Sequence, residues 1–151
     1  MFFLMGLDFA MKEKSVQEAV GYQRDLDPDC LLCRWIGAGK AVETIGTVAA
    51  FNDGYPVTEG HLLIVPLRHT ADGFSMTAQE IHDSLALIHA LSAKIKENDP
   101  SVTGFNIGMN IGESAGQTVF HAHIHLIPRR DGDCDNPRGG VRGVIDGKRC
   151  Y

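Results

Sequence analysis

The most informative segment of this chain reads Gln117-Thr118-Val119-Phe120-His121-Ala122-His123-Ile124-His125-Leu126-Ile127-Pro128. Side chains on a β-strand point alternately to its two faces, so this alternation predicts a strand. The apolar set on one face is Phe120, Ala122, Ile124 and Leu126, and the set on the other face is His121, His123 and His125. Packing does not call for three histidines in register opposite an apolar face. The pattern therefore favours a functional role for the imidazoles.

Three histidines along one strand are compatible with two kinds of chemistry. They could ligate a metal ion together, as imidazoles do in zinc enzymes. Alternatively, one of them could act as a nucleophile while a hydrogen bond to its other ring nitrogen fixes its tautomer. The strand by itself leaves both interpretations open.

Composition limits the classes of protein that need to be considered. The chain has 151 residues, of which 44% are hydrophobic and 22% charged, so we expect one folded domain spanning residues 1–151. The net charge of −5 argues against nucleic acid as a partner. No apolar run is long enough to cross a membrane, and residues 1–10 lack the basic leader of a signal peptide, so we expect no membrane partner and a cytoplasmic location.

The two ends of the chain differ from its middle. Residues 1–29 are expected to form an N-terminal extension with a helix over residues 12–25, and Phe2, Phe3, Leu4 and Phe9 are expected to pack on the core or on a partner subunit. Residues 131–151 are rich in Gly, Asp and Pro and predict a loop segment. Basic residues gather near this end and suit either a polyphosphate or a solvated tail: Arg129, Arg130, Arg138, Arg142, Lys148 and Arg149.

Cys30-Leu31-Leu32-Cys33 is a Cys-x-x-Cys motif, which in a cytosolic protein indicates a metal site or a redox pair. The redox interpretation requires a helix start after a strand, and the flanking sequence does not show that setting. A zinc site needs two more ligands, for which His69 is a candidate. Cys134 and Cys150 fit neither pattern and are interpreted as free thiols.

The remaining elements follow from periodicity. Strands are predicted over residues 41–51, 61–66 and 102–111, with a turn at residues 52–56. A long helix is predicted over residues 76–98, because Thr77 and Glu80 form a capping box and Asp99-Pro100 ends the pattern. Its expected apolar face is Ile81, Leu85, Ile88, Leu91 and Ile95, which leaves His82 and His89 at the surface.

The segment from Gly116 to Arg129 resembles the His-x-His-x-His signature of the histidine triad (HIT) superfamily, and the likeness extends upstream through Asn110 and Gly112 and through residues 51–66. This resemblance implies an α+β, HIT-like fold: an antiparallel sheet of about five strands with one long and one shorter helix. It also implies a homodimer.

The resemblance also implies roles for individual residues. His123 would attack the α-phosphorus of a nucleotide and form a nucleotidyl-histidine, while His61, His121 and His125 support it and the Thr118 hydroxyl lies near the leaving group. Nucleotide contacts are expected from Phe51 at the base, Asp53 at the ribose, and Asn110, Gln117 and Thr118. Asp53 is equally well explained as a turn residue. Bacterial members of the superfamily often hold a structural zinc, for which the ligands here would be Cys30, Cys33, His69 and His121. No organic cofactor is expected.

Several activities remain compatible with the sequence. Within the superfamily, the expected reaction is cleavage of dinucleoside polyphosphates or related conjugates of a purine nucleotide. The downstream arginines favour this reaction over its alternative, hydrolysis of nucleoside phosphoramidates. Outside the chemistry of the superfamily, the chain could be a zinc hydrolase that uses all three triad histidines as ligands, or a nucleotide-binding module without catalysis.

Overall fold

The computed structural model describes residues 25–150. The predicted N-terminal helix, apart from Asp25, and the apolar residues at positions 2–9 lie outside the described residues. None of the helices that are described is long and apolar enough to span a membrane. The homodimer, the cytoplasmic location and the single-domain boundaries stay predictions.

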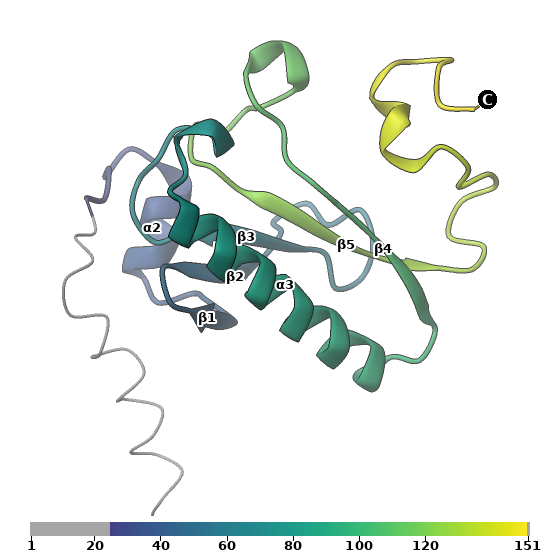
Figure 1. Cartoon of the computed structure of the whole chain (residues 1–151), viewed down its shortest axis with the longest axis horizontal. Coiled ribbons are helices and arrows are strands. Elements are labelled where there is room, and N and C mark those ends of the chain that lie inside the picture. The colour runs from purple at the N-terminus through teal and green to yellow at the C-terminus, as the bar shows by residue number, and fades with distance from the viewer. Residues whose placement is uncertain (1–24, 151) are drawn as a thin grey trace, which may run out of the picture.

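The described chain is built on a five-stranded antiparallel sheet in the order β1-β2-β3-β5-β4 (Figure 1). The strands are β1 (Glu43–Ile45), β2 (Val48–Asn52), β3 (Leu62–Pro66), β4 (Val102–Gly108) and β5 (Ile124–Arg130). Two α-helices, α2 (Leu31–Gly37) and α3 (Ala78–Asn98), lie on opposite faces of this sheet. Short 3-10 turns η1 (Gly73–Ser75), η2 (Glu113–Ala115) and η3 (Gly140–Val144) occur in the connections. The predicted α+β class, the antiparallel sheet and the pairing of a long with a short helix are confirmed.

The histidine segment is only partly a strand, which corrects the prediction of a strand over residues 117–128. β5 begins at Ile124, where it pairs with Ile64 of β3. The next positions along β3 lead to Pro66, which has no N–H to donate to a ladder. Its carbonyl oxygen instead lies 2.9 Å from Nε2 of His121. The alternation of side chains therefore does not extend upstream of His123. As a result, Phe120 is exposed rather than buried.

Residues 41–51 form a hairpin rather than the single predicted strand. β1 and β2 meet at Gly46 and Thr47, where Gly46 has φ 52°, a left-handed conformation that glycine adopts without strain. The Asp83 carboxylate accepts hydrogen bonds from the Thr47 N–H and hydroxyl, both at 2.9 Å. Glycine inside an alternating pattern was the signal for this turn.

The long helix α3 begins as predicted, with Thr77 and Glu80 in a capping box. Its buried face is rotated from the predicted one, because Glu80, Asp83 and Ser84 are buried while Ile81 and Leu85 are exposed. Buried carboxylates are tolerated when they are paired, and Glu80 accepts two hydrogen bonds from Arg68 at 2.7 and 3.0 Å. The surface positions predicted for the helix histidines, 82 and 89, are confirmed.

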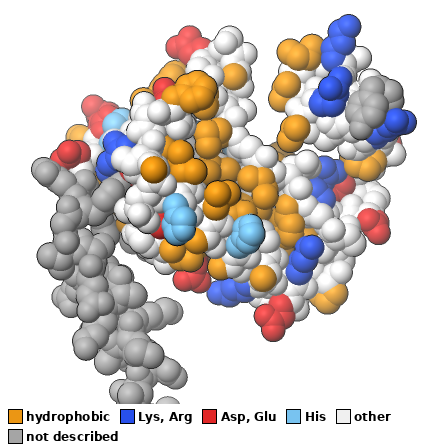
Figure 2. All heavy atoms as spheres, in the orientation of Figure 1, with side chains coloured by type: hydrophobic (Ala, Val, Ile, Leu, Met, Phe, Trp, Pro, Cys, Tyr) orange, Lys and Arg blue, Asp and Glu red, His pale blue; other side chains and the backbone are white. Residues whose placement is uncertain are grey.

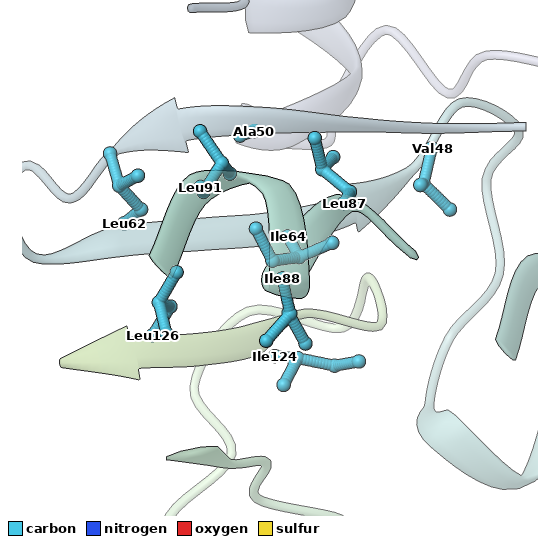
Figure 3. Packing of buried hydrophobic residues seen from close by; sticks show 9 residues of the cluster. All are labelled: Val48, Ala50, Leu62, Ile64, Leu87, Ile88, Leu91, Ile124 and Leu126. Atoms are coloured by element: carbon cyan, nitrogen blue, oxygen red, sulfur yellow. The ribbon is translucent and has the colours of Figure 1, made fainter. Parts of the chain in front are cut away.

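One face of the sheet packs against α3. Leu87, Ile88 and Leu91 point from the helix toward side chains of β2, β3 and β5 (Figure 3). The sheet residues in this cluster are Val48, Ala50, Leu62, Ile64, Ile124 and Leu126. This core positions β5 and therefore the histidines that precede it.

The other face of the sheet is covered by α2 over β2 and β3, where Leu32 and Ile36 pack on Phe51, Leu63 and Val65. Cys30 is the N-cap of this helix and Cys33 lies in its first turn, so the Cys-x-x-Cys motif starts a helix. On the same face, residues of β5 and β4 such as His125 and Asn106 line cavities. β4 itself ends at Gly108, three residues before the predicted end of that strand.

Replacing Glu80 with alanine should destabilise the fold by about 3 kcal/mol, because Arg68 would lose its carboxylate partner and the helix would lose half of its capping box. The free energy of unfolding in urea measures this loss. Glu97→Ala, at an exposed position near the end of the same helix, is the matched control and should change stability by less than about 0.5 kcal/mol. Equal effects of the two variants would contradict the prediction.

Candidate functional site

His61, His123 and His125 gather at the uncovered part of the sheet, whereas the ring of His121 packs against His69. His125 lies in β5 opposite Leu63 of β3, and His61 immediately precedes β3. His121 and His123 lie in the segment that leads into β5. The ring centroid of His125 is 5.1 Å from that of His61 and 5.2 Å from that of His123. The predicted neighbourhood of His61 and the triad is confirmed.

His123 is held by its own backbone neighbourhood. Its Nδ1 lies 2.7 Å from the carbonyl oxygen of His121, so Nδ1 carries the hydrogen and donates it. The other nitrogen, Nε2, then keeps its lone pair, and the side chain lines a cavity of about 260 Å³. The predicted hydrogen bond from this histidine to a backbone carbonyl is confirmed. The arrangement suits a nucleophile with a fixed tautomer.

His61 and His125 form a hydrogen-bond relay, and its direction follows from the donor at its far end. The Val57 N–H donates to Nδ1 of His61 at 3.3 Å, which makes that nitrogen an acceptor. Nε2 of His61 therefore bears the hydrogen and donates to Nδ1 of His125, 2.9 Å away. His125 must then carry its own hydrogen on Nε2. This leaves a hydrogen-bond donor on the side chain next to His123.

Asp53 adds a negative charge beside this relay. Its Oδ2 lies 3.4 Å from Nε2 of His61 and 3.8 Å from Nδ1 of His125. Burial lowers the pKa of both histidines, and the Asp53 carboxylate opposes this effect at each of them. The two rings therefore stay neutral at neutral pH, as the relay requires. The other Asp53 oxygen accepts from the Tyr55 N–H at 2.7 Å, as in the predicted turn.

The cavity next to His123 is lined by both apolar and polar side chains. Leu31, Leu63, Trp35 and Val119 contribute apolar side chains, and Asp53, Asn110 and Thr118 contribute polar ones. Such a combination suits a flat, partly apolar group with a polar extension. Sequence reasoning missed Leu31, Trp35 and Val119. The apolar residues around the Cys-x-x-Cys motif were the available signal.

Two predicted nucleotide contacts lie elsewhere. Phe51 is 1% exposed and packs against Trp35, with ring centroids 6.0 Å apart, so it supports the cavity wall from behind. Gln117 is 4% exposed, and its amide bonds the backbone of Gly112, Ala71 and Val119. A substrate contact by Gln117 would require these bonds to break. Asn110 and Thr118 do line the cavity.

The four predicted metal ligands come together. Ligand atoms of Cys30, Cys33, His69 and His121 all lie within 4.8 Å of one another. Nδ1 of His121 is 3.5 and 3.4 Å from the two sulfurs, and Nδ1 of His69 is 3.4 Å from Sγ of Cys33. A tetrahedral zinc ion separates its sulfur and nitrogen ligands by about 3.5 Å. The geometry therefore fits a four-coordinate ion.

The surroundings of this cluster fit a cation as well. Nε2 of His121 lies 2.9 Å from the Pro66 oxygen and Nε2 of His69 lies 4.0 Å from the Asp27 carboxylate, which are the outer partners that metal-bound histidines have. Burial raises the pKa of the Cys33 thiol to about 11 and lowers the pKa of His121 to about 4. A metal ion would offset the cost of a buried thiolate. The donor set is closed, with no position left for substrate.

The three triad histidines do not converge on one ion. Nδ1 of His121 faces the thiols, Nδ1 of His123 faces a carbonyl, and Nδ1 of His125 faces His61. Within residues 25–150, His123 belongs to neither group of residues whose geometry suits a metal. The alternative in which all three act as zinc ligands is therefore contradicted. The cause is the break in alternation before β5, which turns His121 away from the other two.

Two of the downstream arginines are engaged in ion pairs. Arg129 contacts the Asp133 carboxylate at 2.6 and 2.7 Å and Asn106 at 2.6 Å. Arg130 contacts Asp99 at 2.7 and 3.1 Å. These contacts hold the pKa of each aspartate near 2, with hydrogen bonds from Ser101 the largest cause at Asp99. The argument that these arginines favour a polyphosphate therefore loses its basis.

Activity that depends on the relay should fall as pH drops below about 6.5, because protonation of either ring breaks the relay and burial lowers both pKa values from 6.5. Asp53→Asn removes the charge that raises these pKa values, so the acid limb should move to lower pH. The pH dependence of kcat/KM for both proteins measures the shift. An acid limb that stays in place or moves to higher pH would contradict the assignment.

Comparison with known proteins agrees with this site. A family model described as the HIT domain matches residues 39–132. The chain is 34% identical over 109 residues to an adenosine 5′-monophosphoramidase of Candida albicans, a match that covers 68% of this chain and 71% of that protein.

Solved structures show the same architecture. A HIT family protein from Bacillus anthracis has 36% identity and a TM-score of 0.64, over 70% of this chain and 77% of that one. A zinc-bound histidine triad family protein from Mycobacterium smegmatis has 30% identity and a TM-score of 0.64, over 70% and 78%. The match to the family model spans more than half of the chain and includes His61 and the three triad histidines. The chain belongs to the histidine triad (HIT) family.

Proposed function

We propose that this protein hydrolyses nucleoside phosphoramidates through a covalent nucleotidyl-His123 intermediate. The observation that carries the proposal is the hydrogen bond from Nδ1 of His123 to the His121 carbonyl, which leaves Nε2 with a lone pair beside the cavity. The similarity to an adenosine 5′-monophosphoramidase supports the choice of the phosphorus–nitrogen bond as the one that is cleaved.

The reaction takes place in two displacements. In the first, Nε2 of His123 forms a bond to the α-phosphorus and the bond from phosphorus to the leaving amine breaks. The amine leaves with the electron pair and takes up a proton, for which the Thr118 hydroxyl is positioned as a relay at the cavity. In the second, the oxygen of a water molecule forms a bond to phosphorus and the bond from phosphorus to Nε2 of His123 breaks, with its electron pair returning to the imidazole. The attacking water gives a proton to solvent, so the products are nucleoside monophosphate and neutral His123.

The donor on His125 stabilises the negative charge at phosphorus. Its Nε2–H is fixed by the relay from Val57 through His61, so no reorganisation is needed as charge develops. The Asp53 carboxylate at the cavity is suited to accept hydrogen bonds from ribose hydroxyls, and the apolar side chains of the lining, Trp35 among them, suit a purine base.

Electrostatics favours a single phosphate in this site. No lysine or arginine lines the cavity that holds His123 among residues 25–150. A polyphosphate carries several negative charges and is normally bound by cations. Dinucleoside polyphosphates are therefore the weaker candidate substrates. The alternative to an enzyme is a protein that binds nucleotides without catalysing a reaction.

We infer that the closed cluster of Cys30, Cys33, His69 and His121 holds a structural zinc ion. The support is the tetrahedral spacing of its donors and the likeness to a zinc-bound relative. Bound zinc supplies folding energy and fixes His121, whose carbonyl in turn holds His123. The ion has no part in the displacements.

The test is incubation with an adenosine 5′-phosphoramidate and, separately, with a diadenosine polyphosphate, followed by intact mass measurement. We expect an adenylyl adduct that fragmentation assigns to His123, and faster turnover of the phosphoramidate. Faster turnover of the diadenosine compound would reverse the choice of substrate. Binding of adenosine monophosphate without any adduct or turnover would favour the binding module.

A further inference from the structure

Asp53, His61 and His125 form a group of donor atoms that is separate from the Cys/His cluster. Their ligand atoms all lie within 4.8 Å of one another. Nε2 of His61 is 2.9 Å from Nδ1 of His125, and Oδ2 of Asp53 is 3.4 Å and 3.8 Å from these two nitrogens. The side chain of His61 is buried and the other two are half-buried. The fold therefore gathers the three donors before any ion binds.

The distances within this group match the coordination shell of a zinc ion. Tetrahedral zinc with nitrogen and oxygen ligands at about 2.0 to 2.2 Å separates neighbouring ligand atoms by about 3.4 Å. Two imidazoles and one carboxylate are a ligand set that zinc takes in proteins, with a fourth position left for water. No lysine or arginine lines the cavity at Asp53 within the described residues, so a divalent cation would also balance the charge of this carboxylate.

An ion would replace the hydrogen that His61 donates to His125. Nδ1 of His125 is the acceptor in either case, so the tautomer of that ring is unchanged. The hydrogen of His61 moves to Nδ1, which lies 3.3 Å from the Val57 nitrogen and accepts from its N–H. That hydrogen bond is long, and Val57 is 69% exposed between β2 and β3, so its peptide can rotate away. The loss of this bond makes the site weaker than the cluster, which has two thiolates.

An ion at this position interferes with the nucleotide site. Asp53 and His125 both line the cavity that holds His123. The ion takes up the carboxylate oxygen that suits ribose hydroxyls, and it interrupts the relay that orients His125. The ion and the nucleotide therefore compete for the same two side chains.

We propose that Asp53, His61 and His125 are a second metal site, which binds a divalent transition-metal ion such as Zn²⁺ and thereby excludes nucleotide. The two imidazoles favour zinc over magnesium and calcium, which take oxygen ligands. Binding of the ion depends on these three side chains alone, whereas its competition with nucleotide rests on the proposed function. Zinc in excess of what the cluster binds would hold the protein in a form that does not bind substrate.

The test counts the zinc ions bound per chain by equilibrium dialysis and elemental analysis, at rising concentrations of free Zn²⁺. The purified wild type should hold one ion and take up a second. Asp53→Asn should raise the dissociation constant of the second ion at least about 100-fold, since loss of an outer partner alone costs about 10- to 100-fold. The asparagine oxygen still accepts from the Tyr55 N–H, so the turn is preserved. His125→Gln, a second variant, should have the same effect.

His89→Ala is the matched control, because it removes an exposed imidazole that belongs to no donor group of the described chain. On the face of the molecule shown in Figure 2, exposed histidine side chains lie apart from one another. This variant should take up the second ion as the wild type does. A parallel titration with Co²⁺ tells the sites apart, because only an ion held by cysteine sulfur shows thiolate charge-transfer absorption. The second equivalent should add none.

Competition is measured as the affinity for adenosine monophosphate at rising free Zn²⁺. At ten times the dissociation constant of the second ion, the apparent affinity of the wild type should fall about tenfold, and that of Asp53→Asn should stay constant. A wild type that binds no Co²⁺ free of thiolate absorption, or variants that both retain this ion, would overturn the metal site. Two bound ions with an unchanged nucleotide affinity would overturn the exclusion.

Failure of the proposed function gives a different result. All of these measurements report binding, so the absence of adduct and turnover removes the proposed catalysis and leaves the metal site standing. A wild type that does not bind adenosine monophosphate at all would remove the nucleotide site, and the exclusion with it.

Discussion

Replacing His123 with alanine is expected to abolish adduct formation and to lower kcat/KM by at least about 10⁴-fold, the range found when a covalent nucleophile is removed. The reason is geometric: within the described chain, His123 is the triad histidine whose Nδ1 donates to a backbone carbonyl, which leaves the lone pair on Nε2, and its side chain lines the cavity. Intact mass and steady-state kinetics with the phosphoramidate measure the two effects. The affinity for adenosine monophosphate should change much less.

His89→Ala is the control for this experiment, because His89 is exposed on α3 on the other face of the sheet. It should leave adduct and rate unchanged. His125→Ala provides a further comparison, since it removes a charge-stabilising donor and should slow the reaction by about 10²- to 10³-fold while an adduct still forms. An adduct of undiminished yield in His123→Ala would place the nucleophile elsewhere.

Cys33→Ser is expected to remove bound zinc and to lower the free energy of unfolding by at least about 5 kcal/mol, a drop in Tm of about 10 to 20 °C. Cys33 is buried, and its sulfur lies 3.4 Å from a nitrogen of both histidines in the cluster. Elemental analysis of the purified protein should give one zinc per wild-type chain and none for the variant, and calorimetry measures the change in Tm.

Cys150→Ser is the matched control for the metal experiment. This cysteine is exposed and lies outside the four-residue cluster, so both zinc content and Tm should stay at the wild-type values. Chelation of the wild type should reproduce the stability of Cys33→Ser. A wild type that binds no zinc at micromolar concentrations and melts like the variant would show that the cluster is merely a buried pair of thiols and imidazoles.

The metal cluster and the nucleophile share one residue. The ring of His121 belongs to the cluster, while its backbone carbonyl accepts the hydrogen bond that orients His123. Pro66 contributes to the same arrangement, because its carbonyl oxygen accepts from the far nitrogen of His121. Loss of the ion should therefore reduce activity through the position of His123. It should not do so through loss of a reacting group.

Much of the fold followed from local patterns in the sequence. Thr77 and Glu80 marked the start of α3 because a capping box depends on residues three apart, and the strands near residues 61–66 and 102–111 followed from their apolar patterns. Candidate reactive groups were also accessible, since Cys-x-x-Cys and His-x-His-x-His place them at short, fixed spacings, and the resemblance to the HIT superfamily gave the expected ligand set and nucleophile.

The errors occurred where a contact distant in sequence outweighed the local pattern. The face of α3 turned because Arg68 and Thr47 satisfy Glu80 and Asp83, which made burial of two carboxylates tolerable. β5 begins only at Ile124, later than predicted, because the carbonyl oxygen of Pro66 at the end of the neighbouring strand β3 contacts the His121 side chain. Periodicity depends only on the spacing of apolar residues along the chain. It contains no information about hydrogen-bond partners that other segments supply.

The sequence by itself thus indicated the candidate residues: the triad and the cysteine pair from their spacing, and His61 from the resemblance to the HIT superfamily. Only the tertiary structure decided the partner of each ring nitrogen, by turning His121 toward the thiols, fixing His123 on a carbonyl and directing the His61–His125 relay. It also brought the Asp53 carboxylate to both members of that relay, from the turn that follows β2. Role depends on which ring nitrogen has a partner, and partners are set by packing between distant segments.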